Sequence, residues 1–129
     1  MNKTALLVSV LLTLVACREE PVVEPEPLTE VQSYMANAEA MSRASALFAG
    51  SCADTCHALE PVETTEASYL FDCVWNHGSS DEEIARTIRV GISGTRMVGF
   101  GSNFPEGDAD LWKIVAWLRS KQVGCDTVE

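Results

Sequence analysis

The sequence predicts an all-α domain of three to four helices. Three segments carry helical patterns with recognisable ends, and no segment alternates polar and apolar residues as a half-buried strand does. The 129 residues suit one domain with a single core. We expect that domain to occupy residues 31–125, with 126–129 as a short tail.

Residues 1–16 have the features of a signal peptide. Lys3 precedes an apolar run of about ten residues, too short for a helix to cross a bilayer core of about 30 Å. The small residue before Cys17 is similar to the end of bacterial lipoprotein signals. This resemblance implies cleavage, lipid on Cys17 and a position on the periplasmic side of a bacterial membrane. The alternative is an ordinary secretory signal, or an uncleaved anchor, in which Cys17 has no role.

Residues 17–30 are predicted to form a tether behind the lipidated cysteine. Three prolines and five glutamates occur among residues 18–30, a composition that extends the chain and cannot build a core. Arg18 stands where, by resemblance, Asp is associated with retention in the inner membrane, and this favours the outer membrane.

The charge balance excludes some classes of partner. Loss of Lys3 with the signal changes the net charge from −10 to −11, with 8 basic and 19 acidic residues remaining. Such a surface repels nucleic acid and anionic lipid head groups, so we expect contact with the membrane through the lipid anchor only. It favours protein partners that have a basic docking surface.

The first helix is predicted over residues 31–50, which contain no proline and are rich in alanine. Ala44 and Phe48 lie one turn apart and are expected to face the core together with Leu47. Gly50 is the expected end of the helix, and Met35 and Met41 are expected to pack in the core.

Two further helices follow. Ser80 and Glu83 form a capping box ahead of a short helix that Gly91 ends. Residues 51–77 and 90–107 read as loops. The last helix is predicted over 108–121, with acidic residues at its start and basic residues at its end. Its apolar stripe consists of Leu111, Ile114, Val115 and Leu118.

The stretch from Cys52 to His57 carries the chemistry of the chain. Thiols at Cys52 and Cys56 stand directly before His57. In an exported protein this arrangement attaches haem covalently, because the thiols form thioethers and the imidazole reaches the iron. Three residues separate the cysteines where two are usual, so we expect a bulge to absorb the extra residue. The alternative is a Cys52–Cys56 disulfide.

Around this motif, residues 44–120 resemble the class I cytochrome c family. Phe48 lies four residues before Cys52, as an aromatic residue of the family does. Ala44 stands where a small residue of the family lets two helices cross.

The later segments extend the resemblance. Residues 111–118, with Trp117 at the aromatic position, are similar to the C-terminal helix of the family. Residues 75–81 and 88–97 are similar to segments of cytochromes associated with quinoprotein dehydrogenases. The resemblance implies a cytochrome c fold around one covalent haem c.

A second axial ligand to the iron is implied by the same resemblance. Met97 is the candidate, 40 residues after His57 and in the glycine-rich loop. A thioether ligand raises the reduction potential. The family often has proline after this methionine, where Val98 stands here. His77 is the rival ligand, or a residue at the haem edge.

Cys73 and Cys125 remain once Cys17 is lipidated and the other two thiols hold haem. Exported proteins tend to pair such cysteines, so we expect a disulfide between them. Two unpaired buried thiols are the alternative.

Together these interpretations predict a one-electron carrier that is not itself an enzyme. The resemblance suggests a quinoprotein dehydrogenase as electron donor, and a terminal oxidase or another cytochrome as acceptor. Two other classes stay open. One is a haem-based ligand sensor, in which Met97 would not hold the iron. The other is a disulfide-stabilised lipoprotein that binds a partner without haem.

Overall fold

The computed structural model of the chain describes residues 26–53, 56–61, 67–122 and 125. The predicted signal peptide, Cys17, the tether up to residue 25 and the tail 126–129 lie outside the described residues. Within the described part there is no strand, only an isolated bridge between Gly91 and Val98. The prediction of an all-α domain is confirmed.

Four α-helices and one π-helical turn make up the described secondary structure. They are α1 (Glu30–Met35), α2 (Ala38–Phe48), the π-helical turn η1 (Ala49–Ala53), α3 (Asp81–Val90) and α4 (Asp108–Lys121). None of the helices in these ranges is long and apolar enough to cross a membrane.

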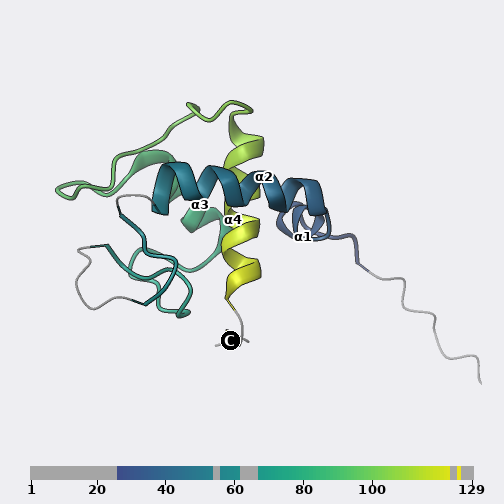
Figure 1. Ribbon diagram of the computed structural model, residues 1–129, viewed down its shortest axis with the longest axis horizontal. Helices are drawn as coiled ribbons and strands as arrows, with labels where there is room; N and C mark the ends of the chain where they lie inside the picture. Colours follow the sequence, from purple (N-terminus) through teal and green to yellow (C-terminus); the bar gives the residue numbers. More distant parts are fainter. Residues whose placement is uncertain (1–25, 54–55, 62–66, 123–124, 126–129) are drawn as a thin grey trace, which may run out of the picture.

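Helix α4 is the centre of the core. It packs against α1, α2 and α3, and Figure 1 shows α2 crossing it at a steep angle. The predicted stripe of α4 is buried, and three neighbours outside the stripe, Asp110, Ala116 and Trp117, are buried as well. The helix therefore contacts protein on most of its circumference and not along a single face.

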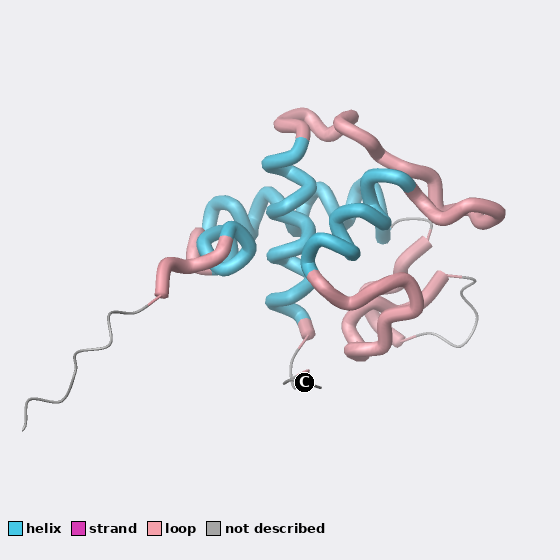
Figure 2. Tube along the Cα trace, turned by 180° about the vertical axis from the view of Figure 1, so that it is seen from behind, coloured by secondary structure: helices cyan, strands magenta, loops and turns pink. Residues whose placement is uncertain are grey.

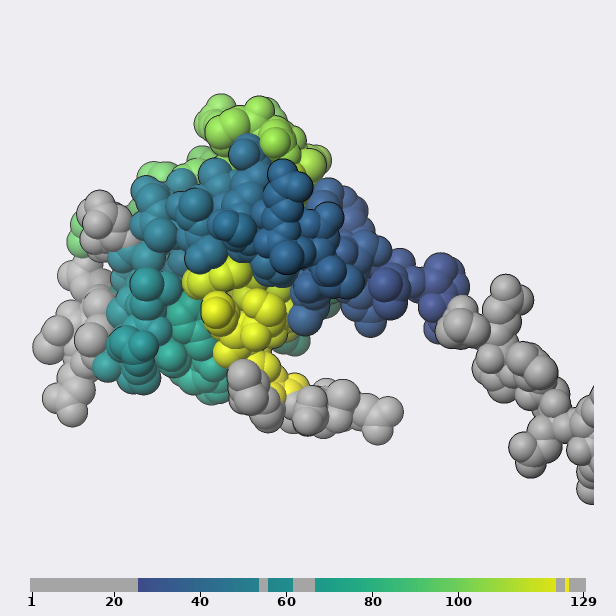
Figure 3. Space-filling model, turned by 45° about the vertical axis from the view of Figure 1, so that its right-hand side comes forward, coloured from purple at the N-terminus to yellow at the C-terminus, as the bar shows by residue number. Residues whose placement is uncertain are grey.

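The crossing of α2 and α4 depends on a small residue and an aromatic pair. Ala44 is fully buried, which lets the two helices approach closely. One turn further, the Phe48 ring lies 4.6 Å from the Trp117 ring, centroid to centroid. Figure 3 shows α2 lying over α4, so that only part of α4 reaches this surface.

The expected first helix is two helices. The chain leaves the helical conformation at Asn37, whose backbone is extended (φ −106°, ψ 108°) and whose side-chain oxygen accepts from the backbone N–H of Ala40 at 3.0 Å. Asparagine is among the best N-cap residues, because this hydrogen bond satisfies an amide that the helix start leaves open. The prediction of an unbroken helix was wrong at this residue.

Two smaller expectations for the first segment were also wrong. Gly50 does not end the helix, since the chain continues through it as η1 up to Ala53. Met35 is 41% exposed at the end of α1 and is not a core residue. Met41 does pack against the core, partly buried.

Helix α3 starts and ends as predicted. The hydroxyl of Ser80 accepts from the backbone N–H of Glu83 at 3.2 Å, and the Glu83 carboxylate accepts from the N–H groups of Ser79 and Ser80. The hydrogen bond from the Ser80 amide is the largest cause that lowers the pKa of Glu83. Gly91 follows the helix with φ +74°.

One ion pair ties α2 to the start of α4. The Arg43 guanidinium donates from Nε to Oδ1 of Asp110 at 2.6 Å and from its NH2 nitrogen to Oδ2 at 2.8 Å. Asp110 is fully buried, and it also accepts from the backbone N–H of Glu106 at 2.9 Å. These hydrogen bonds, with that from Arg43 the strongest, lower the pKa of Asp110 to about 2.

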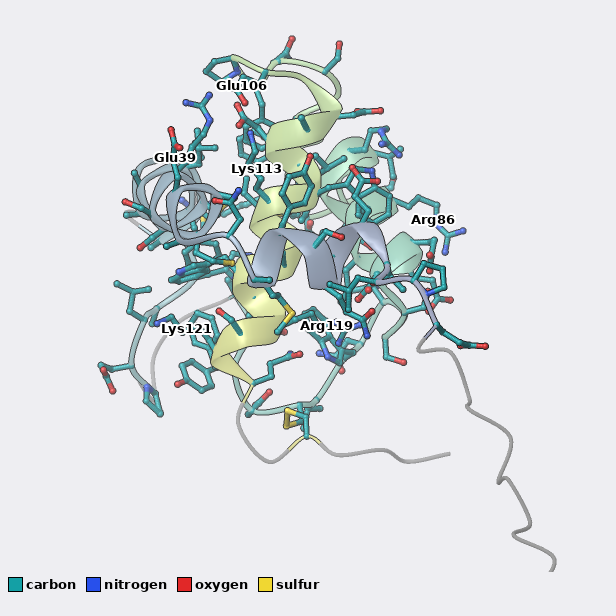
Figure 4. All side chains as sticks on the ribbon, turned by 90° about the vertical axis from the view of Figure 1, so that its right-hand side faces the viewer. Glu39, Arg86, Glu106, Lys113, Arg119 and Lys121 are labelled. Carbon is teal, nitrogen blue, oxygen red and sulfur yellow. A yellow bond between two sulfur atoms is a disulfide. The ribbon has the colours of Figure 1, made fainter. Side chains whose placement is uncertain are left out.

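Further charges surround the pair. Lys113 lies one turn along α4, with its ammonium 3.5 Å from Oδ1 of Asp110, and it also donates to the carboxylate of Glu106. Figure 4 shows Glu106 and Lys113 together at the same end of α4. The buried carboxylate therefore has positive charge on two sides, which satisfies a group that would otherwise be costly to bury.

We predict that Asp110→Asn destabilises the protein by about 2–3 kcal/mol, because it leaves a half-buried guanidinium without its charged partner. The carboxylate is ionised at lower pH in the folded than in the unfolded chain. Its contribution is therefore complete above about pH 4 and lost as the pH falls towards 2. Urea unfolding of both proteins at several pH values measures the difference.

Asp108→Asn is the matched control on the same helix. Asp108 is exposed and pairs with Arg89 at 3.2 Å, so its loss should cost less than about 1 kcal/mol. Equal losses for the two variants would refute the central role of the buried pair.

Candidate functional site

A large cavity lies beside α3, between the loop before that helix and the loop after it. Figure 2 shows the two loop regions on either side of α3. The cavity measures about 1200 Å³, larger than the roughly 300–1000 Å³ of common small-molecule sites. Cys52, Cys56, His57 and Met97 all line it. The structure thus brings the four predicted cofactor residues to one place.

The cavity has an apolar floor and a more polar opening. Among the residues that line it, Ile84, Ile88 and Leu118 are buried. The exposed lining residues mark the opening, and they include the polar His77 and Arg96 as well as the apolar Val74 and Val98. A ligand with an apolar body and a polar edge fits this arrangement.

The π-helical turn η1 places Cys52 at the cavity. It continues α2 without a break, and Cys52 is partly buried and packed against the core. Residues 54 and 55 lie outside the described residues. Cys56 and His57 follow them, and the backbone N–H of His57 donates to the carbonyl of Cys52 at 2.9 Å. The histidine is therefore fixed relative to the first cysteine.

The imidazole of His57 is oriented by a carbonyl group. Its Nδ1 lies 2.9 Å from the backbone oxygen of Ser68. Because a carbonyl only accepts, Nδ1 is the donor in this contact, and in a neutral imidazole this leaves the lone pair on Nε2. This is the arrangement in which histidine ligands are held for a metal ion.

The two cysteines of the motif are reduced in the structure and do not form the alternative disulfide. Burial, assisted by the neighbouring Cys56, raises the pKa of the Cys52 thiol to about 11. A thiol that serves as a nucleophile or a zinc ligand needs a lowered pKa. The environment of Cys52 has the opposite effect.

Met97 is held on a tight loop fastened to the end of α3. Its N–H donates to the Thr95 hydroxyl at 3.1 Å, and its carbonyl accepts from the N–H of Ile92 at 2.9 Å. Beyond it, the N–H groups of Phe100 and Gly101 donate to carbonyls of α3. The backbone on both sides of Met97 is therefore fixed.

Glycine at position 91 allows this loop to close. A Cβ there would lie 2.5 Å from the carbonyl oxygen of Met97 and 2.6 Å from the nitrogen of Gly99. Gly94, in the turn of the same loop, has a similar φ of +78° but open space around it. Both glycines have a positive φ, but of the two only Gly91 is crowded by neighbouring atoms.

His77, the rival ligand, also lines the cavity. It differs from Met97 in burial, since His77 is exposed and Met97 is partly buried. Its carbonyl lies 3.5 Å from the Thr87 hydroxyl of α3. The side chain belongs to the opening of the cavity.

Side chains at the C-terminal end of α4 contact the segment before α3, which contains Trp75 and forms one side of the cavity. Gln122 donates from Nε2 to the carbonyl of Leu70 at 3.0 Å. Arg119 pairs with Asp81 at 2.6 Å, donates to the carbonyl of Ser79, and lies 5.6 Å from the centre of the Trp75 ring. Figure 4 shows Arg119 on the later turns of α4.

A disulfide also connects the loop before α3 to the segment after α4. The sulfur atoms of Cys73 and Cys125 are bonded, with their Cα atoms 5.5 Å apart. Cys73 has φ +66°, an uncommon conformation for a residue with a side chain. The loop before α3 is therefore held to the C-terminal end of the chain at several points.

Sequence reasoning missed two contributors to the site. Ser68 acts through its backbone carbonyl, so no side-chain pattern marks it. Arg96 lines the cavity next to Met97, and its position beside the candidate ligand is the signal that could have identified it. Across the described ranges, no three His, Cys, Asp or Glu side chains are grouped so that they could hold a metal ion.

We predict that Gly94→Ala costs about 1–2 kcal/mol, the usual penalty for a side chain in the left-handed region. Gly91→Ala should cost about 3 kcal/mol or more, because the added methyl group also overlaps the backbone of Met97 and Gly99. Denaturant unfolding of both variants compares the costs. Equal values would mean that the loop does not close on Gly91.

Comparison of the chain with protein-family models, with curated proteins and with solved structures finds no match in any of the three. The residues of this cavity are therefore the observations from which a function can be inferred.

Proposed function

We propose that the protein is an exported one-electron carrier that holds one haem c covalently, in a domain of the cytochrome c type. A single observation supports this most strongly. Two thiols, an oriented imidazole and a thioether, drawn from two separate loops, line one cavity with an apolar floor. These are the groups that attach and ligate haem in such proteins.

The residues of the cavity fit this group in size and chemistry. The volume of about 1200 Å³ is large enough for a broad planar cofactor, and the buried aliphatic side chains would pack on its apolar surface. Cys52 and Cys56 would hold it by thioethers, and His57 and Met97 would bind its iron. When bound, the haem supplies an iron that cycles between Fe(III) and Fe(II).

The three-residue spacing of the cysteines occurs beside a π-helical turn of the backbone. A π-helical turn holds one more residue than the α-helical turn it replaces, and such turns are frequent at functional sites. Cys52 lies in the π-helical turn η1, and the hydrogen bond from His57 to its carbonyl spans the same motif. The extra residue is thus compatible with a normal relation between Cys56 and His57.

The hydrogen bond to Ser68 supports a role for His57 as a permanent ligand. With Nδ1 bound to a carbonyl, the lone pair of Nε2 is kept available and the ring cannot rotate freely. Met97 is restrained in a similar way by its loop. If His57 and Met97 both bound the iron, the site would suit electron transfer and would leave no position for a substrate.

The likeness of the α2–α4 crossing to the expected family pattern adds support. Ala44, Phe48 and Trp117, the positions on which the resemblance to class I cytochromes c depends, meet at this crossing. The net charge of −10 favours redox partners with a basic docking surface, such as a dehydrogenase and an oxidase or second cytochrome. Lipid on Cys17 would keep the carrier on the periplasmic side of a membrane, the outer one by preference.

We predict that the full chain, exported from a bacterial host that matures c-type cytochromes, is coloured and keeps its pigment through acid–acetone extraction. The spectrum in alkaline pyridine should be that of haem with two thioethers. Cys52→Ser and Cys56→Ser should each shift this spectrum to that of one thioether, and the double variant should release the pigment to the solvent.

The double variant Cys73→Ser/Cys125→Ser is the matched control, because both cysteines lie outside the motif and their joint replacement leaves no unpaired thiol, so both thioethers should stay intact. A colourless wild-type protein, or one whose pigment is extracted completely, would refute the proposal. It would then favour the alternative of a disulfide-stabilised lipoprotein without haem.

We also predict that Met97→Ala opens the sixth position of the iron. The reduced variant should bind carbon monoxide readily, and its potential should fall by on the order of 100 mV, because the thioether favours reduced iron. His77→Ala is the comparison and should leave both properties near those of the wild type. The opposite pattern would assign the ligand to His77, and ready binding by the wild type would indicate a ligand sensor.

A further inference from the structure

The carbonyl group that orients His57 lies on a loop and not on a helix. Its residue, Ser68, is exposed and belongs to the segment between η1 and α3, where the described residues form no helix or strand. A carbonyl in such a segment is not held by a ladder of backbone hydrogen bonds, and loops move more than helices do. The contact of 2.9 Å between Nδ1 of His57 and this carbonyl therefore needs another group that keeps Ser68 in place.

The side chain of Ser68 has such a partner. The Asn76 amide donates from Nδ2 to Oγ of Ser68 at 3.2 Å, so a side-chain contact closes the loop between the two residues. Both residues also line the cavity. Ser68 thus presents its carbonyl to His57 and its hydroxyl to Asn76, and its backbone is restrained between these two contacts.

Asn76 itself belongs to a segment that is fixed to the helices. The Trp75 ring before it packs against the core, and the centre of this ring lies 5.6 Å from the guanidinium of Arg119 on α4. Ser79 after it donates from its N–H to the Glu83 carboxylate of α3 at 2.9 Å, and its carbonyl accepts from Arg119. The Asn76 side chain therefore connects a fixed segment to the residue whose carbonyl holds the imidazole.

We propose that Asn76 is a positioning residue for His57, because its hold on the Ser68 hydroxyl keeps the Ser68 carbonyl within hydrogen-bond distance of the imidazole. This assignment rests on the proposed function. A hydrogen bond from Nδ1–H to a carbonyl makes the ring a stronger electron donor at Nε2. A stronger donor stabilises Fe(III) relative to Fe(II), so the contact of Asn76 with Ser68 lowers the reduction potential of the bound haem.

The first test measures the midpoint potential of the full exported chain with its haem attached. Asn76→Ala releases Ser68, weakens the hydrogen bond to His57 and should raise the potential. A general loosening of the cavity would have the opposite sign, because water that enters stabilises the more highly charged Fe(III) form. A potential that falls or stays unchanged in Asn76→Ala would overturn the assignment.

Asn103→Ala is the matched control, because it makes the same chemical change at another exposed asparagine. Asn103 lies in the loop before α4 and does not line the cavity. The midpoint potential of this variant should stay near that of the wild type. Equal rises for the two asparagine variants would also overturn the assignment, since the effect would then not depend on contact with Ser68.

The second test asks whether Asn76 acts through Ser68. Ser68→Ala removes the hydroxyl and keeps the backbone carbonyl, so it should raise the potential as Asn76→Ala does. The double variant should show no further rise, because both substitutions break the same contact. Ser68→Thr retains a hydroxyl and should keep the wild-type potential. Additive rises would show that Asn76 acts by a route other than Ser68 and would refute the proposal.

A third measurement follows the hydrogen bond of His57 directly. In the oxidised protein, the NMR signal of the Nδ1 proton reports how fast this proton exchanges with solvent. Asn76→Ala and Ser68→Ala should each accelerate the exchange about 2–10-fold, the range expected of one neutral hydrogen bond. Asn103→Ala should leave the exchange rate unchanged. Exchange as slow as in the wild type in both Asn76→Ala and Ser68→Ala would contradict the assignment.

The outcomes separate this assignment from the proposed function. Both substituted side chains are exposed, so the variants are expected to fold. A coloured wild-type protein whose potential does not respond to Asn76→Ala refutes the positioning role and leaves the electron carrier standing. A colourless wild-type protein refutes both.

Discussion

The burial of α4 is the constraint on which the rest of the structure depends. A helix that contacts protein on most sides needs neighbours all around it, and α1, α2 and α3 supply them. Burial extends even to Asp110, whose carboxylate is acceptable there because Arg43 and a backbone amide bind it. The helical frame in turn fixes both loops of the cavity, one at the end of α3 and the other at the end of α4.

Local signals predicted the helices well where the residues that determine them are close in the sequence. The bounds of α4 agree with the predicted 108–121, and the Ser80 capping box lies where it was expected. Both depend on residues at most one or two turns apart. The gathering of Cys52, His57 and Met97 at one cavity was implied only by the resemblance, since no local pattern states which loops meet.

What could not be predicted depends on tertiary contacts or on backbone atoms. The partner of Asp110 lies 67 residues away, so the sequence suggested only a favourable charge at the start of a helix. The break at Asn37 was not expected, because the segment contains no proline and is rich in alanine. Gly50 was expected to end a helix, but η1 continues through it and places Cys52 at the cavity.

The contacts between the end of α4 and the Trp75 side of the cavity have a consequence for the order in which the chain folds. Arg119, Gln122 and Cys125 are separated from the Cys52–His57 motif by more than sixty residues of chain. A polypeptide that emerges with its amino end first therefore exposes the thiols of Cys52 and Cys56 long before these later residues can make their contacts. The motif is therefore accessible during that interval, and the contacts of Arg119 with Trp75 and of Gln122 with Leu70 form only once the later segment has arrived.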